Sequence, residues 1–199
     1  MTRALGRLIL RVFGWRIVGT LPTARKYVLC AAPHTSNWDF VFTVATYWAV
    51  GVKLHWVGKA SLFKGPFGPI MRGFGGIAVD RSQPQGMVQA LAEAFRRADH
   101  LVVAVPTEGS RSRREYWKSG FYHIARSAGV PVVLGSLDFP KREATLGPTV
   151  EPVDDVRAFM DSLRTFYADK VGRYPEKFGP VRIKEEDAAT TNVPSAGSG

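Results

Sequence analysis

Residues 27–39 read Tyr-Val-Leu-Cys-Ala-Ala-Pro-His-Thr-Ser-Asn-Trp-Asp, and this stretch decides how the rest of the chain is interpreted. Its apolar run, 27–32, predicts a buried β-strand, because an unbroken apolar run of this length is typical of a strand covered on both faces. A proline then breaks the strand, and Ser36 and Asn37 offer side chains that can cap the helix-like run that follows. The pattern therefore places His34 at the carboxyl end of a strand, where open α/β sheets bind their ligands.

A carboxylate follows this histidine within reach. Asp39 falls in the first turn of the predicted helix, close to the loop that carries His34. A neutral imidazole can take a proton from an alcohol near pH 7, and a carboxylate behind it fixes the tautomer and stabilises the imidazolium. We therefore predict that His34 is a general base and that Asp39 orients it. The alternative is a capping loop whose histidine only hydrogen-bonds the backbone.

Around this stretch, short apolar runs alternate with longer helix-like segments. Strands are predicted at 15–19, 26–32, 53–58, 76–80, 101–105 and 130–138, with a weaker signal at 146–150. Helices are predicted at 38–50, 84–98, 117–128 and 154–169, with a broken one near 66–73. Such alternation is typical of an α/β protein, so we expect a single three-layer domain with a largely parallel or mixed central sheet.

The first 20 residues form a unit of their own, an amphipathic helix over 2–14 followed by a strand. Three arginines at every fourth position form one stripe of this helix: Arg3, Arg7 and Arg11. Apolar side chains cover much of the rest of its surface. Either the apolar face packs on the domain, or it enters a membrane surface while the arginines contact lipid phosphates. A main domain over 21–187 and a polar, disordered tail over 188–199 complete the predicted organisation.

The charge balance points to anionic partners. Lys and Arg number 27 against 17 Asp and Glu, which gives a formal net charge of +10. Phosphorylated substrates, an anionic membrane surface and nucleic acid are the three classes of partner that such a charge favours.

The cysteine and histidine content restricts the other possibilities. Cys30 is the single cysteine, which excludes an internal disulfide framework and favours a reducing compartment. The four histidines have no metal-ligand spacing and there is no cysteine cluster, so a metal site is not predicted. No resident cofactor is expected. Apolar runs stay shorter than the roughly 18 residues of a membrane-spanning helix. We therefore expect a cytoplasmic protein that is peripheral on the inner face of the membrane.

A second loop with polar side chains follows the apolar run 101–105. Glu108, Gly109, Ser110 and Arg111 lie there, again at the predicted carboxyl end of a strand. Glycine permits a tight turn that lets the backbone approach a ligand closely. The planar guanidinium of Arg111 suits a phosphate group.

Between the two loops the chain is basic and rich in glycine. Lys59, Lys64, Arg72 and Arg81 stand there among five glycines, a composition that suits an anionic headgroup. The alternative is a set of solvated charges on exposed loops.

His34 and Asp39, with four residues between them, resemble the first motif of the glycerolipid acyltransferases, the family of the lysophosphatidic acid acyltransferases of phospholipid synthesis. Further blocks resemble that family in the same order along the chain, over roughly residues 27 to 140: 59–63 with 67–68, 76–81, 108–112 and 130–133. The chain departs from the family pattern at Thr107, Ser110 and Leu134, where proline, threonine and a second proline are usual.

The resemblance implies a fold like that of glycerol-3-phosphate acyltransferase and a defined reaction. A fatty acyl group would move from an acyl thioester, acyl-CoA or acyl carrier protein, to a hydroxyl of a lysophospholipid such as 1-acyl-glycerol-3-phosphate. It makes His34 and Asp39 catalytic and assigns the binding of the phosphorylated glycerol lipid to six further positions: Lys59, Arg81, Glu108, Gly109, Ser110 and Arg111.

Other functions stay open at this point. The acceptor could be a different lipid or an amine alcohol. From other classes, a non-catalytic basic domain that binds lipid or nucleic acid would account for the positive charge. A nucleic-acid-binding domain leaves the ordered His, Glu and Arg motifs unexplained, so no nucleic-acid partner is expected.

Overall fold

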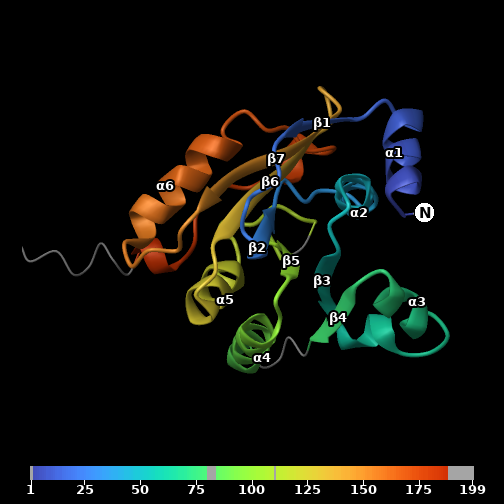
Figure 1. The fold of residues 1–199 in the computed structure, drawn as a ribbon. Helices are drawn as coiled ribbons and strands as arrows, with labels where there is room; N and C mark the ends of the chain where they lie inside the picture. The colour runs from blue at the N-terminus through green and yellow to red at the C-terminus, as the bar shows by residue number, and fades with distance from the viewer. Residues whose placement is uncertain (1, 80–83, 110, 188–199) are drawn as a thin grey trace, which may run out of the picture.

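The computed structural model describes residues 2–79, 84–109 and 111–187, which form an α/β domain around one seven-stranded sheet (Figure 1). The strands are β1 (Arg16–Gly19), β2 (Lys26–Ala31), β3 (Leu54–Lys59), β4 (Gly76–Val79), β5 (Leu101–Pro106), β6 (Val132–Asp138) and β7 (Glu143–Val150). The helices are α1 (Thr2–Val12), α2 (Trp38–Val50), α3 (Gly68–Gly73), α4 (Pro84–Arg97), α5 (Gly120–Ala128) and α6 (Val156–Tyr167). Two short 3₁₀ helices, η1 (Ala60–Phe63) and η2 (Pro175–Lys177), were not predicted.

The sheet is mixed, with strand order β1-β7-β6-β2-β5-β3-β4. Strands β6, β2, β5, β3 and β4 run parallel, whereas β7 is antiparallel to β6 and β1 is parallel to β7. The antiparallel pair follows from a short connection, since a parallel crossover needs a dozen or more residues. Arg142 has a left-handed φ of 52° in this turn and donates its backbone N–H to Phe139 O at 3.3 Å.

Alternate residues of the central strand face different layers. Val28 and Cys30 of β2 belong to a large core with α4, α5 and α6, whereas Tyr27 and Leu29 pack with residues of α2 on the opposite face. Figure 1 shows the sheet between these two helical layers, with α1 beyond α2. Covering on both faces explains the unbroken apolar run in the sequence, and it confirms the predicted three-layer α/β domain.

The structure adjusts several predicted boundaries. The weak strand signal at 146–150 is the second half of β7, which begins at Glu143 because the tight turn ends there and β6 and β1 pair with it on both sides. Arg81, Ser110 and the tail 188–199 lie outside the described residues. The division at residues 20 and 187 stays a prediction.

Candidate active site

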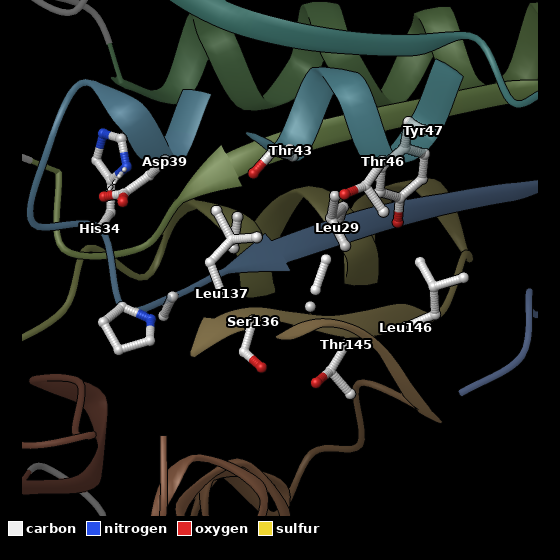
Figure 2. Close-up of a pocket in the computed structure, with 15 residues that line it drawn as sticks. Leu29, His34, Asp39, Thr43, Thr46, Tyr47, Ser136, Leu137, Thr145 and Leu146 are labelled. Atoms are coloured by element: carbon white, nitrogen blue, oxygen red, sulfur yellow. Dashed lines mark ion pairs between the residues drawn. The ribbon is translucent and has the colours of Figure 1, made fainter. Parts of the chain in front are cut away.

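His34 lies in the loop between β2 and α2, at the carboxyl end of the central strand. Its Nδ1 is 3.5 Å from Oδ2 of Asp39, and the two side chains are 21% and 4% exposed. Figure 2 shows the imidazole and the carboxylate facing each other at one end of a small pocket between α2 and the sheet. The predicted juxtaposition of these two residues is thus present in the fold.

Asp39 also holds the loop in shape. Its Oδ2 accepts the backbone N–H groups of Thr35 at 2.7 Å and Ser36 at 2.8 Å, and its Oδ1 accepts the Ser36 hydroxyl at 2.9 Å. The predicted capping roles of Ser36 and Asn37 are wrong: Asn37 occupies the N-cap position in a helical conformation and makes no side-chain cap. The reason is that the carboxylate in the first turn of α2 reaches back and takes the loop amides itself.

Glu108 supports the same loop from the end of β5. Its Oε1 accepts the backbone N–H of His34 at 2.7 Å, and the residue is 2% exposed. Burial raises the pKa of this carboxyl group to about 7; the His34 amide lowers the pKa and the charge of Asp39 raises it. A carboxyl group in this position fixes the backbone at His34, and it does not line either pocket at the site.

The electrostatic surroundings keep His34 neutral. Burial lowers the pKa of the imidazole, the Asp39 carboxylate raises it, and the nearby Arg111 guanidinium lowers it further. Because the net direction is down, the ring is unprotonated at neutral pH and can accept a proton.

A large cavity opens beside the pair, towards β3 and η1. Its volume is about 720 Å³, and His34, Asp39, Lys59, Gly109 and Arg111 all border it. Its remaining walls are mainly apolar, with side chains from α2, β3, η1 and α3: Phe40, Val41, Val44, Leu54, Trp56, Val57, Leu62 and Met71. A cavity of this size and lining fits a long apolar chain with a polar group at the His34 end.

Two of the bordering residues sit in the loop after β5. Gly109 has a φ of +69° and donates its N–H to Pro106 O at 3.1 Å, so it forms the tight turn that the sequence predicts. Arg111 crosses to the other loop and donates a hydrogen bond from Nη1 to Oδ1 of Asn37. The two motifs, more than seventy residues apart in sequence, are therefore linked directly at the site.

A second, small pocket, drawn in Figure 2, also borders His34 and Asp39. It extends from His34 and Asp39 along α2 to Tyr47, and Thr43 borders both this pocket and the large cavity. Its volume of about 40 Å³ has room for a few water molecules and is too small for an acyl chain.

Sequence reasoning found most of the residues at this site and missed some contacts. It identified His34, Asp39, Lys59, Gly109 and Arg111, which the structure brings together. It missed the hydrogen bond from the His34 amide to Glu108, because no local spacing reports a contact between the ends of two strands. That β2 and β5 are neighbours, with Ala31 opposite Pro106, is a property of the sheet order.

Within residues 2–79, 84–109 and 111–187, no group of three or more His, Cys, Asp and Glu is placed to hold a metal ion. None of the helices in that part of the chain is long and apolar enough to cross a membrane.

Known proteins that resemble this chain are acyltransferases. A family model described as acyltransferase matches residues 16–134, more than half of the chain. A curated relative, the 1-acyl-sn-glycerol-3-phosphate acyltransferase of Haemophilus influenzae, is 31% identical over 142 residues, which is 67% of this chain and 58% of the relative. The match thus spans somewhat more than half the length of that protein.

A solved structure has the same fold. The crystal structure of the 1-acyl-sn-glycerophosphate (LPA) acyltransferase PlsC from Thermotoga maritima aligns with a TM-score of 0.54 and 18% sequence identity. The alignment covers 84% of this chain and 74% of that one.

Proposed function

The chain belongs to the acyltransferase family, and from this premise we propose that it transfers a fatty acyl group from an acyl thioester to a hydroxyl of a lysophospholipid such as 1-acyl-glycerol-3-phosphate. The observation that carries the proposal is the His34–Asp39 pair at the border of a largely apolar cavity of about 720 Å³, with Lys59 and Arg111 at the same border. The curated relative is named for this activity.

His34 acts as the general base. With Nδ1 facing Asp39, Nε2 is the nitrogen that takes the proton of the acceptor hydroxyl while its oxygen attacks the thioester carbonyl carbon. The tetrahedral intermediate collapses, the carbon–sulfur bond breaks, and the imidazolium returns the proton to the thiolate. The products are an ester and a thiol, and the enzyme is regenerated without a covalent intermediate.

Asp39 and Glu108 keep the base in place. Asp39 holds the imidazole tautomer and the loop amides, and Glu108 fixes the backbone of His34. Each contact limits the motion of the base relative to a bound hydroxyl, and correct positioning is a large part of the rate enhancement in such a reaction. In this proposal Glu108 acts through the loop rather than on the phosphate.

Lys59 and Arg111 bind the phosphate of the acceptor, assisted by the close approach that Gly109 permits. Both side chains border the cavity, and a guanidinium offers two parallel donors to a phosphate. The acyl chain of the donor lies along the apolar wall. The donor is acyl-CoA or an acyl carrier protein thioester, and the reaction needs no resident cofactor.

The protein works at the cytoplasmic face of an anionic membrane, which α1 contacts. In this helix Gly6 and Leu10 are buried, whereas Leu5, Leu8 and Val12 are 47%, 56% and 70% exposed. Its Arg3, Arg7 and Arg11 border an open groove with the end of α2. Apolar side chains beside arginines suit the interface of an anionic bilayer.

An acceptor screen tests the proposed reaction. Purified protein is incubated with one acyl-CoA and, separately, 1-acyl-glycerol-3-phosphate, glycerol-3-phosphate, an uncharged monoacylglycerol and an amine alcohol. We expect thiol release and a diacyl product, identified by mass spectrometry, with the first acceptor. Release of thiol with the amine alcohol alone would assign the other acceptor class, and the absence of any acyl transfer would reject the proposal.

A further inference from the structure

The connection from β3 to β4, residues 60–74, has an unusually apolar outer surface. This segment, the β3–β4 arm, consists of η1 and α3 and projects past the edge of the sheet formed by β4 (Figure 1). Four large apolar side chains are exposed on it: Leu62 at 49%, Phe67 at 67%, Ile70 at 49% and Phe74 at 39%. Clustered exposure of this kind marks an interaction surface more often than a chance arrangement.

Other contacts pack the arm against the domain, so the exposed apolar side chains are not needed to hold it there. Phe63 is 5% exposed and its ring lies 5.6 Å from that of Trp56 in β3. The Trp56 indole donates to Phe74 O at 3.0 Å. Gly68 packs so closely that a Cβ would lie 2.3 Å from Phe63 O. The inner side of the arm is thus filled, and the apolar outer side chains remain available for a partner.

The arm continues the surface of α1 across α2. The Trp48 ring of α2 stacks on Phe74 at 5.7 Å, and Gly6 of α1 packs where an added Cβ would lie 2.9 Å from Cβ of Trp48. Figure 1 shows α2 between α1 and α3 on one side of the molecule. Two exposed apolar surfaces, that of α1 and that of the arm, therefore flank the same helix.

The charge of the segment that contains α1, α2 and the arm indicates the class of partner. Residues 1–79 contain ten Lys and Arg and one acidic residue, Asp39, whereas residues 80–199 contain seventeen and sixteen. On the arm itself Lys64 and Arg72 are exposed and acidic residues are absent. Apolar side chains beside cations, with almost no anions, are complementary to an anionic bilayer, whose interior takes the apolar groups and whose phosphates take the charges.

Two exposed apolar side chains, one on α2 and one on the arm, also line the large cavity. Val41 of α2 and Leu62 of η1 are 38% and 49% exposed, and both also line the cavity beside His34. The apolar outer surface thus continues into the cavity wall without an intervening acidic residue.

We propose that the β3–β4 arm is a second membrane-contact element, separate from α1, and that the two together seat the molecule on an anionic bilayer with the cavity entrance between Val41 and Leu62 at the membrane surface. A lipid acyl chain then passes from the bilayer into the cavity along an apolar path. The identity of that lipid rests on the proposed function, whereas the contact of the arm with the bilayer does not.

A fluorescent label on the arm tests the contact directly. Phe67→Cys is labelled with nitrobenzoxadiazole, while the unsubstituted protein, in which Cys30 is buried, gives the background. With vesicles of phosphatidylcholine and phosphatidylglycerol we expect a blue shift and a several-fold gain in emission. Val153→Cys, at a site with 46% exposure before α6, serves as the control and should keep the spectrum of a label in water.

Polar substitutions test whether the contact contributes to binding. Phe67→Ser with Ile70→Ser should lower partitioning onto these vesicles about tenfold or more, since both apolar side chains lose burial in the bilayer. Val153→Ser should leave partitioning unchanged. Circular dichroism confirms that each variant is folded.

Two results would overturn the inference: a label at position 67 that stays in water while the protein sediments with vesicles, or serine variants that partition as the parent does. Acyl transfer to 1-acyl-glycerol-3-phosphate dispersed in detergent is measured in parallel. If the parent protein shows no acyl transfer while the label at position 67 responds to vesicles as expected, the proposed function is rejected and the membrane contact stands.

Discussion

The two ends of the described chain both carry an amphipathic helix, but they differ in what covers the apolar face. In α6, Phe159, Met160, Leu163 and Tyr167 are buried in the main core. In α1, only Gly6 and Leu10 are buried, although the helix has a similar apolar stripe. The same amphipathic periodicity thus contributes buried side chains to the core in α6 and exposed apolar side chains in α1.

This difference extends beyond the two helices. Of the fourteen large apolar side chains that are exposed in the described part of the chain, twelve lie between residues 5 and 74. The region after residue 84 buries its apolar side chains and balances its charges with ion pairs such as Arg164 with Glu186. We therefore propose that the amino-terminal region provides the membrane contacts and most of the substrate cavity, and that the carboxyl-terminal region provides the framework, Gly109 and Arg111 at the cavity border and, through Glu108, one support of the loop that carries His34.

The largest expected effect concerns the base that the amino-terminal region supplies. His34→Ala should lower the turnover number about 10²–10⁴-fold, because the acceptor hydroxyl loses its proton acceptor. Thiol release from acyl-CoA measures this rate. His100→Ala, at an exposed histidine, is the matched control. Near-normal turnover of His34→Ala, with an unchanged circular dichroism spectrum, would contradict the mechanism.

The contrast between the two helices predicts different losses of stability. Leu163→Ala should lower the free energy of unfolding by about 2–5 kcal/mol, because it leaves a cavity in the core. Leu8→Ala, at 56% exposure, should change it by less than about 0.5 kcal/mol. Urea denaturation compares the two variants, and equal losses would mean that α1 packs as α6 does.

Glu108 is one contribution of the carboxyl-terminal region to the site, and it predicts a dependence of stability on pH. Its pKa is raised in the folded state from 4.5 to about 7, so its contribution to stability is fully present below pH 4.5 and is lost as the pH rises through 7. Glu108→Gln keeps an oxygen for the His34 amide but does not titrate. Relative to this variant, the parent protein should lose up to about 3 kcal/mol between roughly pH 4.5 and 8. Urea denaturation at both ends of that interval tests this, and a constant difference between the two proteins would rule it out.

Arg111 joins the two regions, and its substitution separates binding from positioning. Arg111→Ala should weaken apparent acceptor affinity by about 1.5–3 kcal/mol, since a charge-assisted contact with phosphate is lost. The apparent affinity for the donor should change less. Steady-state kinetics with each substrate varied in turn measures both, with Arg97→Ala as a control at a surface ion pair. A fall in turnover alone would instead indicate that Arg111 acts by holding Asn37 and the catalytic loop.

The smallest effect concerns the arginine stripe of α1. Arg7→Gln should reduce partitioning onto anionic vesicles by about 1 kcal/mol, roughly fivefold, and the effect should shrink at high salt because the attraction is screened. Arg157→Gln in α6 is the control from the other region. Co-sedimentation with vesicles at low and high ionic strength measures both variants. An equal effect of the two substitutions would contradict a specific role of α1 in membrane binding.

Much of this fold was predictable from local pattern. The strand before His34 and the helix after it follow from an apolar run and the residues that end it. Among the described residues, the seven strands and six α-helices all occur where the pattern indicates them. The His34–Asp39 pair was predictable for the same reason, since five residues across a strand–helix junction span a short distance. Gly109 was recognisable because a turn with positive φ favours glycine.

The amino-acid sequence by itself thus determined the elements, the juxtaposition of His34 and Asp39 and the basic character of the amino-terminal region, because each depends on residues close together in the chain. The tertiary structure decided which strands are neighbours, and so it alone brings Glu108 under His34 and Arg111 to Asn37. It also decided which apolar faces are covered: α6 lies against the sheet, whereas no element of the described part of the chain lies over the outer faces of α1 and the β3–β4 arm. Amphipathic periodicity reports that a face is apolar, and only the packing of distant segments determines what that face contacts.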